Sequence, residues 1–241
     1  ADPQTTLMIL CNPQNPAGNI WDRETLARIG ALCKQYDVIV VSDEIHCDLT
    51  KPGTEYIPFA SVDDTCRDIS VTCIAPTKTF NLAGLQTAAV YAENSILHHR
   101  MWRQLNTDEV AEPNAFAIQA TIAAFQYGEE WLDELREYVE KNKQYVTEFL
   151  QEKIPLIHPV AGDATYLMWL DCRKITESGR QFVKFIRKTS GLYVSGGNQY
   201  GRGGEGFLRV NVATSKLVVE DGMQRLYESV DAWLKEEKIS K

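Results

Sequence analysis

The sequence predicts an α/β fold, in which a mostly parallel sheet with flanking helices is followed by a smaller α+β domain. Three short apolar runs in the first half, at residues 7–11, 38–41 and 69–74, have the length of buried strands. A helical pattern separates the first two runs, which gives the strand, helix, strand order of a βαβ unit. In the second half the predicted strands and helices no longer follow that order, which is typical of an α+β domain.

A turn-rich loop and then a helix are predicted after the first strand. Leu7–Cys11 leads into Asn12-Pro-Gln-Asn-Pro-Ala-Gly18, where two Asn-Pro steps and a glycine stop a helix or strand from continuing. Asp22 is placed to cap the helix that follows, because its carboxylate can accept a hydrogen bond from the first turn. The apolar face of this helix is expected to consist of Leu26, Ile29, Leu32 and Tyr36.

Polar residues that follow the second and third strands are expected at one edge of the sheet. Val38–Val41 leads into Ser42-Asp-Glu-Ile-His46, and Ile69–Ile74 leads into Ala75-Pro-Thr-Lys-Thr-Phe-Asn81. Ligands of open parallel sheets bind outside the carboxyl ends of the strands. A desolvated lysine amine at such a position can attack an aldehyde, whereas most lysines beside a loop are solvated surface groups. Lys78 is therefore a candidate catalytic residue only together with the motifs around it.

The remaining residues are predicted to complete a large domain, 1–145, and to form a small domain, 146–241. Glu129–Lys153 has the pattern of a long amphipathic helix, which we expect to bridge the two domains. The other predicted elements are helices over Ser95–Leu105, Pro113–Tyr127, Arg180–Thr189 and Val218–Lys235, a strand over Tyr166–Leu170, and strands near Leu192–Val194 and Phe207–Ala213.

Composition indicates a cytoplasmic protein with a substantial core. The 241 residues are 44% hydrophobic, and no apolar stretch approaches the roughly 20 residues that a membrane helix needs. The net charge of −8 argues against a nucleic-acid-binding surface. We therefore expect a small-molecule partner, and neither a nucleic acid nor a membrane.

Neither the cysteines nor the histidines form a metal-binding pattern. The six cysteines contain no C-x-x-C pair and the four histidines make no metal-spaced set with them, so we predict no metal site and free thiols that are buried or partly buried. His98 and His99 are adjacent in a predicted helix and are assigned to the surface. Gly201–Gly206 fits G-x-G-x-x-G, but it precedes a strand, whereas a dinucleotide-binding loop follows one.

Four motifs in this order resemble the aspartate aminotransferase superfamily of fold-type I pyridoxal-phosphate enzymes. Asn12-Pro-Gln-Asn-Pro-Ala-Gly18 is similar to its Asn-Pro-x-Asn-Pro-x-Gly loop, and Ser42-Asp-Glu44 to the motif that contacts the cofactor nitrogen. Pro76-Thr-Lys-Thr-Phe80 is similar to the segment that binds the cofactor covalently, and Gly206-Phe-Leu-Arg-Val-Asn211 to the strand that binds the substrate carboxylate. The resemblance implies an aspartate-aminotransferase-like fold and pyridoxal 5'-phosphate as the cofactor.

The resemblance also implies a role for each matching residue. Lys78 corresponds to the lysine that binds the cofactor and moves the Cα proton, and Asp43 to the carboxylate that pairs with the pyridine nitrogen. Asn15 corresponds to the asparagine that donates to the phenolic oxygen of the cofactor, although an asparagine here is also a normal turn residue. Thr77 is expected near the cofactor phosphate. Arg209 is expected to bind the α-carboxylate of an amino-acid substrate, and to project from the small domain toward the cofactor.

Three departures from the commonest family pattern bear on the reaction. His46 replaces a tyrosine that most members carry, and this replacement resembles the MalY/PatB-like cystathionine β-lyase branch. Gln86 stands where many aminotransferases place a phosphate-binding arginine, and Ala75 replaces a hydroxyl residue. The implied activity is a C–S β-lyase acting on cystathionine or cysteine-type substrates. An aminotransferase of class I/II and a cofactor-binding regulatory module are the alternatives.

The family normally carries a long upstream portion that none of these motifs covers. That portion supplies a phosphate cradle, an aromatic residue that stacks on the cofactor ring and part of a dimer contact. We therefore expect the 241 residues to be a C-terminal fragment, with the N-terminal part of the family fold absent, of an enzyme that is a homodimer at full length. Cofactor affinity and activity are expected to be poor if nothing replaces the upstream portion.

Overall fold

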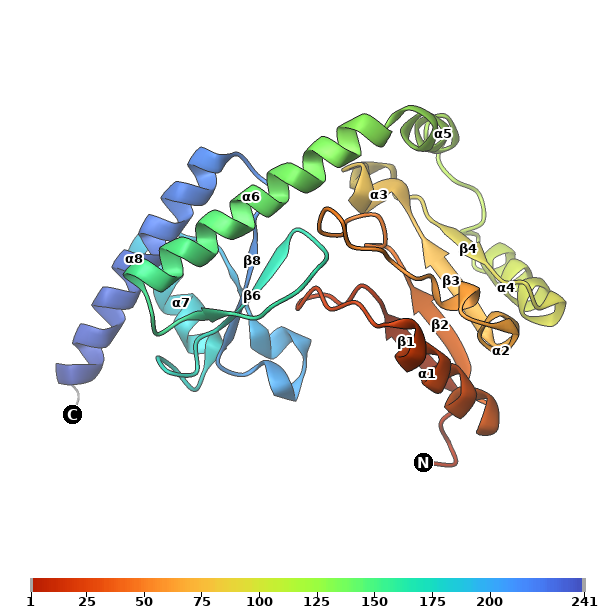
Figure 1. Ribbon diagram of the computed structural model, residues 1–241, viewed down its shortest axis with the longest axis horizontal. Coiled ribbons are helices and arrows are strands. Elements are labelled where there is room, and N and C mark those ends of the chain that lie inside the picture. Colours follow the sequence, from red (N-terminus) through yellow and green to blue (C-terminus); the bar gives the residue numbers. More distant parts are fainter. Residues whose placement is uncertain (1, 240–241) are drawn as a thin grey trace. The chain divides into compact units, whose positions relative to one another are not determined.

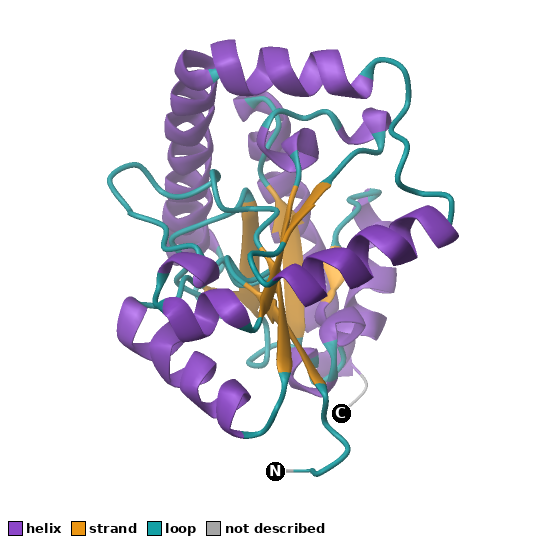
Figure 2. Cartoon of the chain, turned by 90° about the vertical axis from the view of Figure 1, so that its right-hand side faces the viewer, coloured by secondary structure: helices purple, strands orange, loops and turns teal. Residues whose placement is uncertain are grey.

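The computed structural model of the chain describes residues 2–239, which divide into two compact units (Figure 1). Unit 1 comprises the residues up to Asn15, together with Asn19–Arg136 and Asp163–Thr165. Unit 2 comprises Pro16–Gly18, Glu137–Gly162 and the residues from Tyr166 onward. In each unit the strands form a sheet with helices packed beside it (Figure 2).

The sheet of unit 1 is mixed and mostly parallel, as the sequence predicts. Its strands are β1 (Leu7–Cys11), β2 (Ile39–Asp43), β3 (Ser70–Ile74) and β4 (Ala89–Tyr91), in the order β1-β2-β3-β4 among the described residues. The first three strands are parallel and β4 is antiparallel to β3. The three predicted strands are thus present, with β2 and β3 each beginning one residue later than expected, whereas β4 was not predicted.

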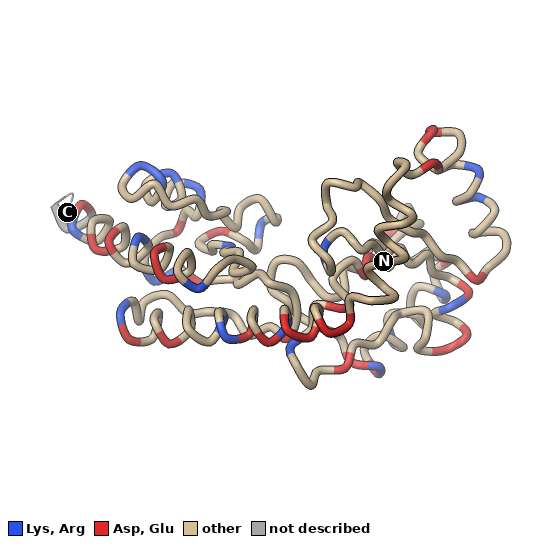
Figure 3. The backbone as a smooth tube through the Cα atoms, turned by 90° about the horizontal axis from the view of Figure 1, so that it is seen from above, with Lys and Arg blue, Asp and Glu red and all other residues tan. Residues whose placement is uncertain are grey.

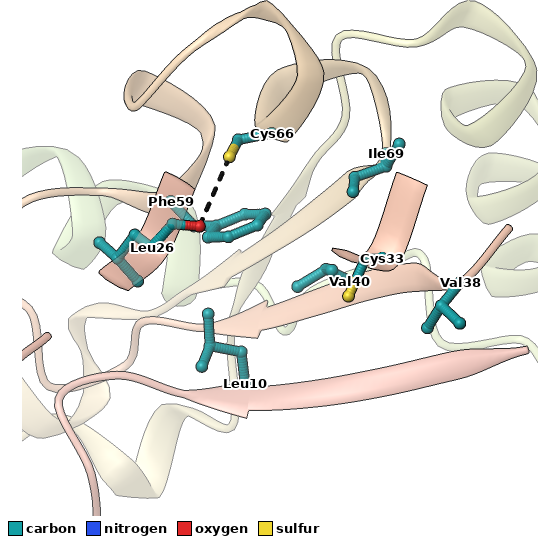
Figure 4. Close-up of a cluster of buried hydrophobic side chains, with 8 residues drawn as sticks. All are labelled: Leu10, Leu26, Cys33, Val38, Val40, Phe59, Cys66 and Ile69. Carbon is teal, nitrogen blue, oxygen red and sulfur yellow. Dashed lines mark hydrogen bonds between the residues drawn. The ribbon is translucent and has the colours of Figure 1, made fainter. Parts of the chain in front are cut away.

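A capped helix and a short second helix cover one face of this sheet. Helix α1 (Arg23–Gln35) begins at Asp22, whose carboxylate accepts a hydrogen bond from the Thr25 backbone N–H at 2.7 Å, as predicted. The short helix α2 (Asp64–Asp68) and the 3₁₀ turn η1 (Phe59–Ser61) pack beside it. The side chains buried between these elements and the sheet, shown in Figure 4, are Leu10, Leu26, Cys33, Val38, Val40, Phe59, Cys66 and Ile69.

Strand β1, which was expected to be buried, is covered on one face only. Leu7 is 50% exposed and Ile9 is 69% exposed, whereas Leu10, on the opposite face, is buried against α1. Alternate residues of a strand point to opposite faces, so the face of β1 that points away from α1 is open to solvent. The last turn of α1 also departs from the prediction, because Leu32 and Tyr36 are more than half exposed.

Four further helices follow β3. They are α3 (Pro76–Thr79), α4 (Ser95–Thr107), α5 (Ala117–Tyr127) and α6 (Glu129–Lys153), of which α6 contributes residues to both units. Helix α4 is capped by Asn94, whose side chain accepts hydrogen bonds from the backbone of Ile96 and Leu97. The predicted helix from Pro113 begins only at Ala117, because Asn114 accepts a hydrogen bond from the Phe116 backbone and forms a turn there.

Unit 2 combines an antiparallel sheet with long helices. The strands β5 (His158–Pro159), β6 (Leu167–Asp171), β8 (Phe207–Asn211) and β7 (Ser195–Gly196) are neighbours in that order within the described chain. The helices are α7 (Gly179–Ser190), the second part of α6, and α8 (Lys216–Ile239). The buried Asn142 of α6 donates hydrogen bonds to the carbonyls of Val212 and Thr214 just beyond β8.

The strand expected near Leu192–Val194 begins directly after these residues, as β7. Helix α7 ends at Gly191, which adopts a left-handed conformation with φ of 72°. Pairing with β8 begins only at Ser195, opposite Arg209. The apolar residues Leu192 and Val194 therefore lead into the strand and do not form it.

Basic and acidic residues both occur along the backbone of each unit (Figure 3). His98 and His99 are exposed on α4, as expected. The six cysteines are free thiols, of which Cys33, Cys66 and Cys172 are buried and the other three are partly buried, as expected. Among the described residues, no helix is both long enough and apolar enough to cross a membrane.

Candidate active site

The loop that follows β1 is tied to the end of β2. The Asn12 backbone N–H donates to the Asp43 carbonyl at 3.1 Å, and the Asn12 carbonyl accepts from the Tyr56 hydroxyl at 2.8 Å. The Asn12 side chain is fully buried, and its Oδ1 atom accepts from the Trp21 backbone at 3.2 Å. These bonds fix the start of the loop that carries Asn15, which is partly buried in a turn.

Asp43 ends β2 between two cysteines on the neighbouring strands. The register pairs Asp43 with Cys11 of β1 and with Cys73 of β3, so the three side chains share one face of the sheet. The Asp43 Oδ1 atom accepts a hydrogen bond from the Ile45 backbone at 3.2 Å. Burial, with a smaller contribution from the Asp43 charge, raises the pKa of both thiols. The carboxylate therefore has neutral neighbours on both sides.

Glu44, the next residue, points into the interior. It is 2% exposed, and its Oε1 atom accepts hydrogen bonds from the Ser42 hydroxyl at 2.8 Å and from the Phe59 backbone at 3.0 Å. Burial raises the pKa of Glu44, while these hydrogen bonds oppose that rise. Burial and the Glu44 carboxylate in turn raise the pKa of Tyr56. His46 is also buried, at 3% exposure.

Lys78 lies on the short helix α3, directly after β3. Thr77 and Lys78 are partly exposed, whereas Thr79 is fully buried. Phe80 ends the helix and packs against Phe125 and Trp131, with ring centroids 5.2 Å and 6.1 Å away. The carboxyl ends of β1, β2 and β3 thus present an amide, a carboxylate and an amine at one edge of the unit 1 sheet.

Arg209 belongs to unit 2, where aromatic residues surround it. On β8 it is paired with Trp169 on one side and with Ser195 on the other. Its guanidinium lies 5.0 Å from the centre of the Tyr200 ring, within the range of a cation–π contact. Burial raises the pKa of Tyr166, and the positive charge of Arg209 opposes that rise.

The loop before β8 is closely packed. A side chain at Gly204 would lie 1.9 Å from the carbonyl oxygen of Gly197, so this close approach of two backbone segments requires glycine. The 3₁₀ turn η4 (Arg202–Gly204) lies in this segment, which leads into the strand that carries Arg209.

Unit 1 brings Asn15, Asp43, His46, Thr77 and Lys78 to the same strand ends, and unit 2 holds Arg209. Gln86 is exposed, with a left-handed φ of 47°. The sequence did not identify four residues that support this arrangement, which are Asp48, Tyr56, Thr79 and Tyr200. Tyr56 bonds to Asn12, 44 positions away, and Asp48 bonds to Thr79, 31 positions away, while Tyr200 contacts Arg209 from the loop before β8, so local spacing gave no signal.

Residues 1–226 match the family model described as aminotransferase class I and II. The chain belongs to this family. The membership that the four motifs suggested is therefore confirmed, and so is the fold class.

Two named proteins are similar to this chain over most of its length. Cystathionine β-lyase PatB of Bacillus subtilis (strain 168) is 42% identical over 226 residues, which cover 94% of this chain and 58% of PatB. Protein MalY of Escherichia coli (strain K12) is 31% identical over 233 residues, covering 96% of this chain and 59% of MalY. The chain thus spans somewhat more than half the length of these relatives.

A solved structure of a family member has the same fold. The pyridoxal-phosphate-bound C–S lyase of Staphylococcus hominis superposes with a TM-score of 0.84 at 33% identity, and the match covers 93% of this chain and 58% of that one. The expected aspartate-aminotransferase-like fold is therefore present as a part of the family fold.

Proposed function

We propose that this protein is a pyridoxal-phosphate-dependent C–S β-lyase that acts on cystathionine or cysteine-type sulfur amino acids. The observation that carries the proposal is the placement of Asn15, Asp43, His46 and Lys78 at adjoining strand ends of one sheet. The similarity to PatB, at 42% identity, supports a lyase over an aminotransferase, because the Bacillus subtilis aspartate aminotransferase is only 24% identical.

The donor set at these strand ends fits pyridoxal 5'-phosphate. A primary amine, Lys78, matches the cofactor aldehyde, and a carboxylate, Asp43, matches a protonated pyridine nitrogen. The amide of Asn15 can donate to the phenolic oxygen, and the Thr77 hydroxyl can donate to the phosphate. The buried Nδ2 atom of Asn12 has no hydrogen-bond partner among the described residues, which leaves a further donor at the end of β1. When bound, the cofactor supplies an electron sink for the charge that develops at the substrate Cα.

Lys78 has two tasks in this proposal. Its amine holds the cofactor and, once the substrate amine has replaced it, removes the proton from the substrate Cα. Asp43 keeps the pyridine nitrogen protonated. The thiols of Cys11 and Cys73, which lie beside Asp43 on the neighbouring strands, are neutral and so add no second charge next to this carboxylate. The Cβ–S bond then breaks and expels a thiol. Addition of water to the remaining fragment gives pyruvate and ammonia.

Arg209 is proposed to bind the substrate α-carboxylate through two parallel hydrogen bonds. A bidentate contact orients the substrate, and orientation decides which bond at Cα is broken. The contact of its guanidinium with the Tyr200 ring, at 5.0 Å, supports a fixed side-chain direction.

His46 is proposed to influence whether elimination or transamination follows removal of the Cα proton. It is buried two residues after Glu44, at the strand end that carries Asp43. His46→Tyr restores the residue that most aminotransferases carry, so we expect the ratio of pyruvate release to keto-acid formation to fall. An unchanged ratio would remove the role assigned to His46.

We also propose that the protein has domains at 1–145 and 146–241, is located in the cytoplasm and forms a homodimer. Free thiols, three of them buried, are typical of a reducing compartment. Helix α5 buries Ala117, whereas Ile118 and Phe125 are exposed by half or more, which supports contact with another protein surface.

The experiment that tests the proposal measures products. Purified protein saturated with pyridoxal 5'-phosphate is given cystathionine, and pyruvate and free thiol are quantified together. A parallel reaction with an amino acid and a keto acid measures transamination. Equal amounts of pyruvate and thiol support the lyase, whereas keto-acid exchange without thiol release supports an aminotransferase and contradicts the proposal.

A further inference from the structure

Helix α3, which carries Lys78, is too short to fix its own orientation. It has four residues, Pro76–Thr79, and Ala75 at its start provides no side-chain hydrogen bond to the first turn. Isolated helices of this length are unstable in water, because the first turn costs more conformational entropy than its hydrogen bonds return. The direction of the Lys78 side chain must therefore be set by contacts between α3 and other parts of unit 1.

One such contact joins α3 to the loop after β2. The Thr79 hydroxyl donates a hydrogen bond to the Oδ2 atom of Asp48 at 3.0 Å. Thr79 is fully buried, and Asp48 is partly buried. A hydrogen bond to a charged acceptor is stronger than one between neutral groups, and partial burial strengthens it further.

Asp48 is itself held in place by the backbone around it. The Leu49 N–H donates to the His46 carbonyl at 3.0 Å, and the Leu49 carbonyl accepts from the Thr165 N–H at 2.7 Å. The backbone beside Asp48 is therefore held in place in the loop that begins directly after Asp43. The hydrogen bond from Thr79 to Asp48 connects the strand end of β2 to the helix that carries Lys78.

We propose that Asp48 and Thr79 are positioning residues for Lys78. Successive residues of a helix point about 100° apart, so a fixed direction for Thr79 also fixes the direction of Lys78 beside it. The hydrogen bond thereby holds the lysine amine in register with the Asp43 carboxylate. The inference rests on the proposed function, in which Lys78 and Asp43 hold the same cofactor.

The decisive variant is Thr79→Val, which keeps the shape of the side chain and removes the donor. The partly exposed Asp48 can then be hydrated, so the folded state is retained. We expect the dissociation constant for pyridoxal 5'-phosphate to rise about tenfold, the equivalent of one hydrogen bond to a charged group. Thr79→Ser preserves the donor and should bind the cofactor as the unmodified protein does. Asp48→Asn keeps an acceptor but removes its charge, so it should weaken cofactor binding by less than Thr79→Val does.

A second readout requires no cofactor. The rate at which acetic anhydride labels the Lys78 amine is measured by mass spectrometry, with the exposed Lys188 as an internal standard. Thr79→Val should change the ratio of Lys78 to Lys188 labelling, and Thr79→Ser should restore it. Thr65→Val, at a partly exposed threonine of α2, is the matched control for the substitution itself. Urea unfolding of each variant measures stability separately.

The outcomes separate the positioning role from a general structural one. A changed labelling ratio and weaker cofactor binding in Thr79→Val, both restored by Thr79→Ser and both absent from Thr65→Val, support the proposal, provided that urea unfolding shows each variant to be folded under the assay conditions. It is overturned if Thr79→Val labels Lys78 and binds the cofactor as the unmodified protein does, or if Thr79→Ser fails to restore labelling. If the unmodified protein does not bind the cofactor through Lys78, the proposed function fails, while the labelling ratio still decides the role of Thr79.

Discussion

Removal of the Glu44 carboxylate is predicted to destabilise the protein strongly, because it is a buried acceptor. In Glu44→Ala, the Phe59 backbone N–H loses its partner at a fully buried position, which costs about 1–3 kcal/mol. The Ser42 hydroxyl loses its acceptor as well, which adds about 1 kcal/mol. We therefore expect the free energy of unfolding to fall by about 3 kcal/mol. Glu44→Gln keeps the accepting oxygen and should cost about 1 kcal/mol or less.

Urea unfolding followed by circular dichroism measures these differences. Glu55 is exposed on the same loop, so Glu55→Ala is the matched control and should change stability by no more than about 0.5 kcal/mol. If Glu44→Ala is no less stable than Glu55→Ala, the assignment of Glu44 as a buried acceptor is refuted.

The pH dependence of the same variants provides a separate check. Burial raises the pKa of Glu44 in the folded state, so the folded protein holds this proton more tightly than the unfolded chain does. The stability that this group contributes is therefore fully present below its ordinary pKa, and is lost as the pH rises through the raised value. The unmodified protein should lose stability relative to Glu44→Gln over that interval. A difference that does not vary with pH would contradict the raised pKa.

Two further predictions follow from burial and from a ring contact. Leu26→Ala, at a fully buried position of α1, should lower the free energy of unfolding by about 3 kcal/mol. Leu32→Ala on the same helix should lower it by about 1 kcal/mol or less, because Leu32 is 52% exposed. Equal losses of stability in urea unfolding would contradict the assigned burial. Tyr200→Leu should raise KM for the amino-acid substrate by about three- to tenfold with little change in kcat, because it removes the ring beside Arg209, and Tyr200→Phe should not. A loss confined to kcat would count against a role in carboxylate binding.

The strand ends could be predicted because their signals are local. An apolar run followed by Asn-Pro steps, or by Ser42-Asp-Glu, marks where a strand stops, and parallel strands stop at a common edge. Helix α1 was predicted with its first residue because Asp22 is a capping residue immediately before an apolar pattern.

Local sequence signals could not predict which apolar residues of β1 are exposed, nor the hydrogen bonds that hold the site residues in place. Apolarity alone does not show which face of β1 is covered, so the exposure of Leu7 and Ile9 depends on elements that lie elsewhere in the fold. The hydrogen bond between Asp48 and Thr79 joins residues 31 positions apart, and neither residue type indicates its partner. The strand β4 has three residues and depends on pairing with β3, so its own sequence carries little signal.

The central claim is that Lys78, which follows β3, binds pyridoxal 5'-phosphate at the sheet edge where Asp43 ends β2. Borohydride reduction of the protein incubated with the cofactor, followed by proteolysis and mass spectrometry, identifies the amine that is linked to it. We predict a single modified peptide, containing Lys78, and its loss in Lys78→Ala. Modification of another lysine, or an unchanged yield in Lys78→Ala, would contradict the claim.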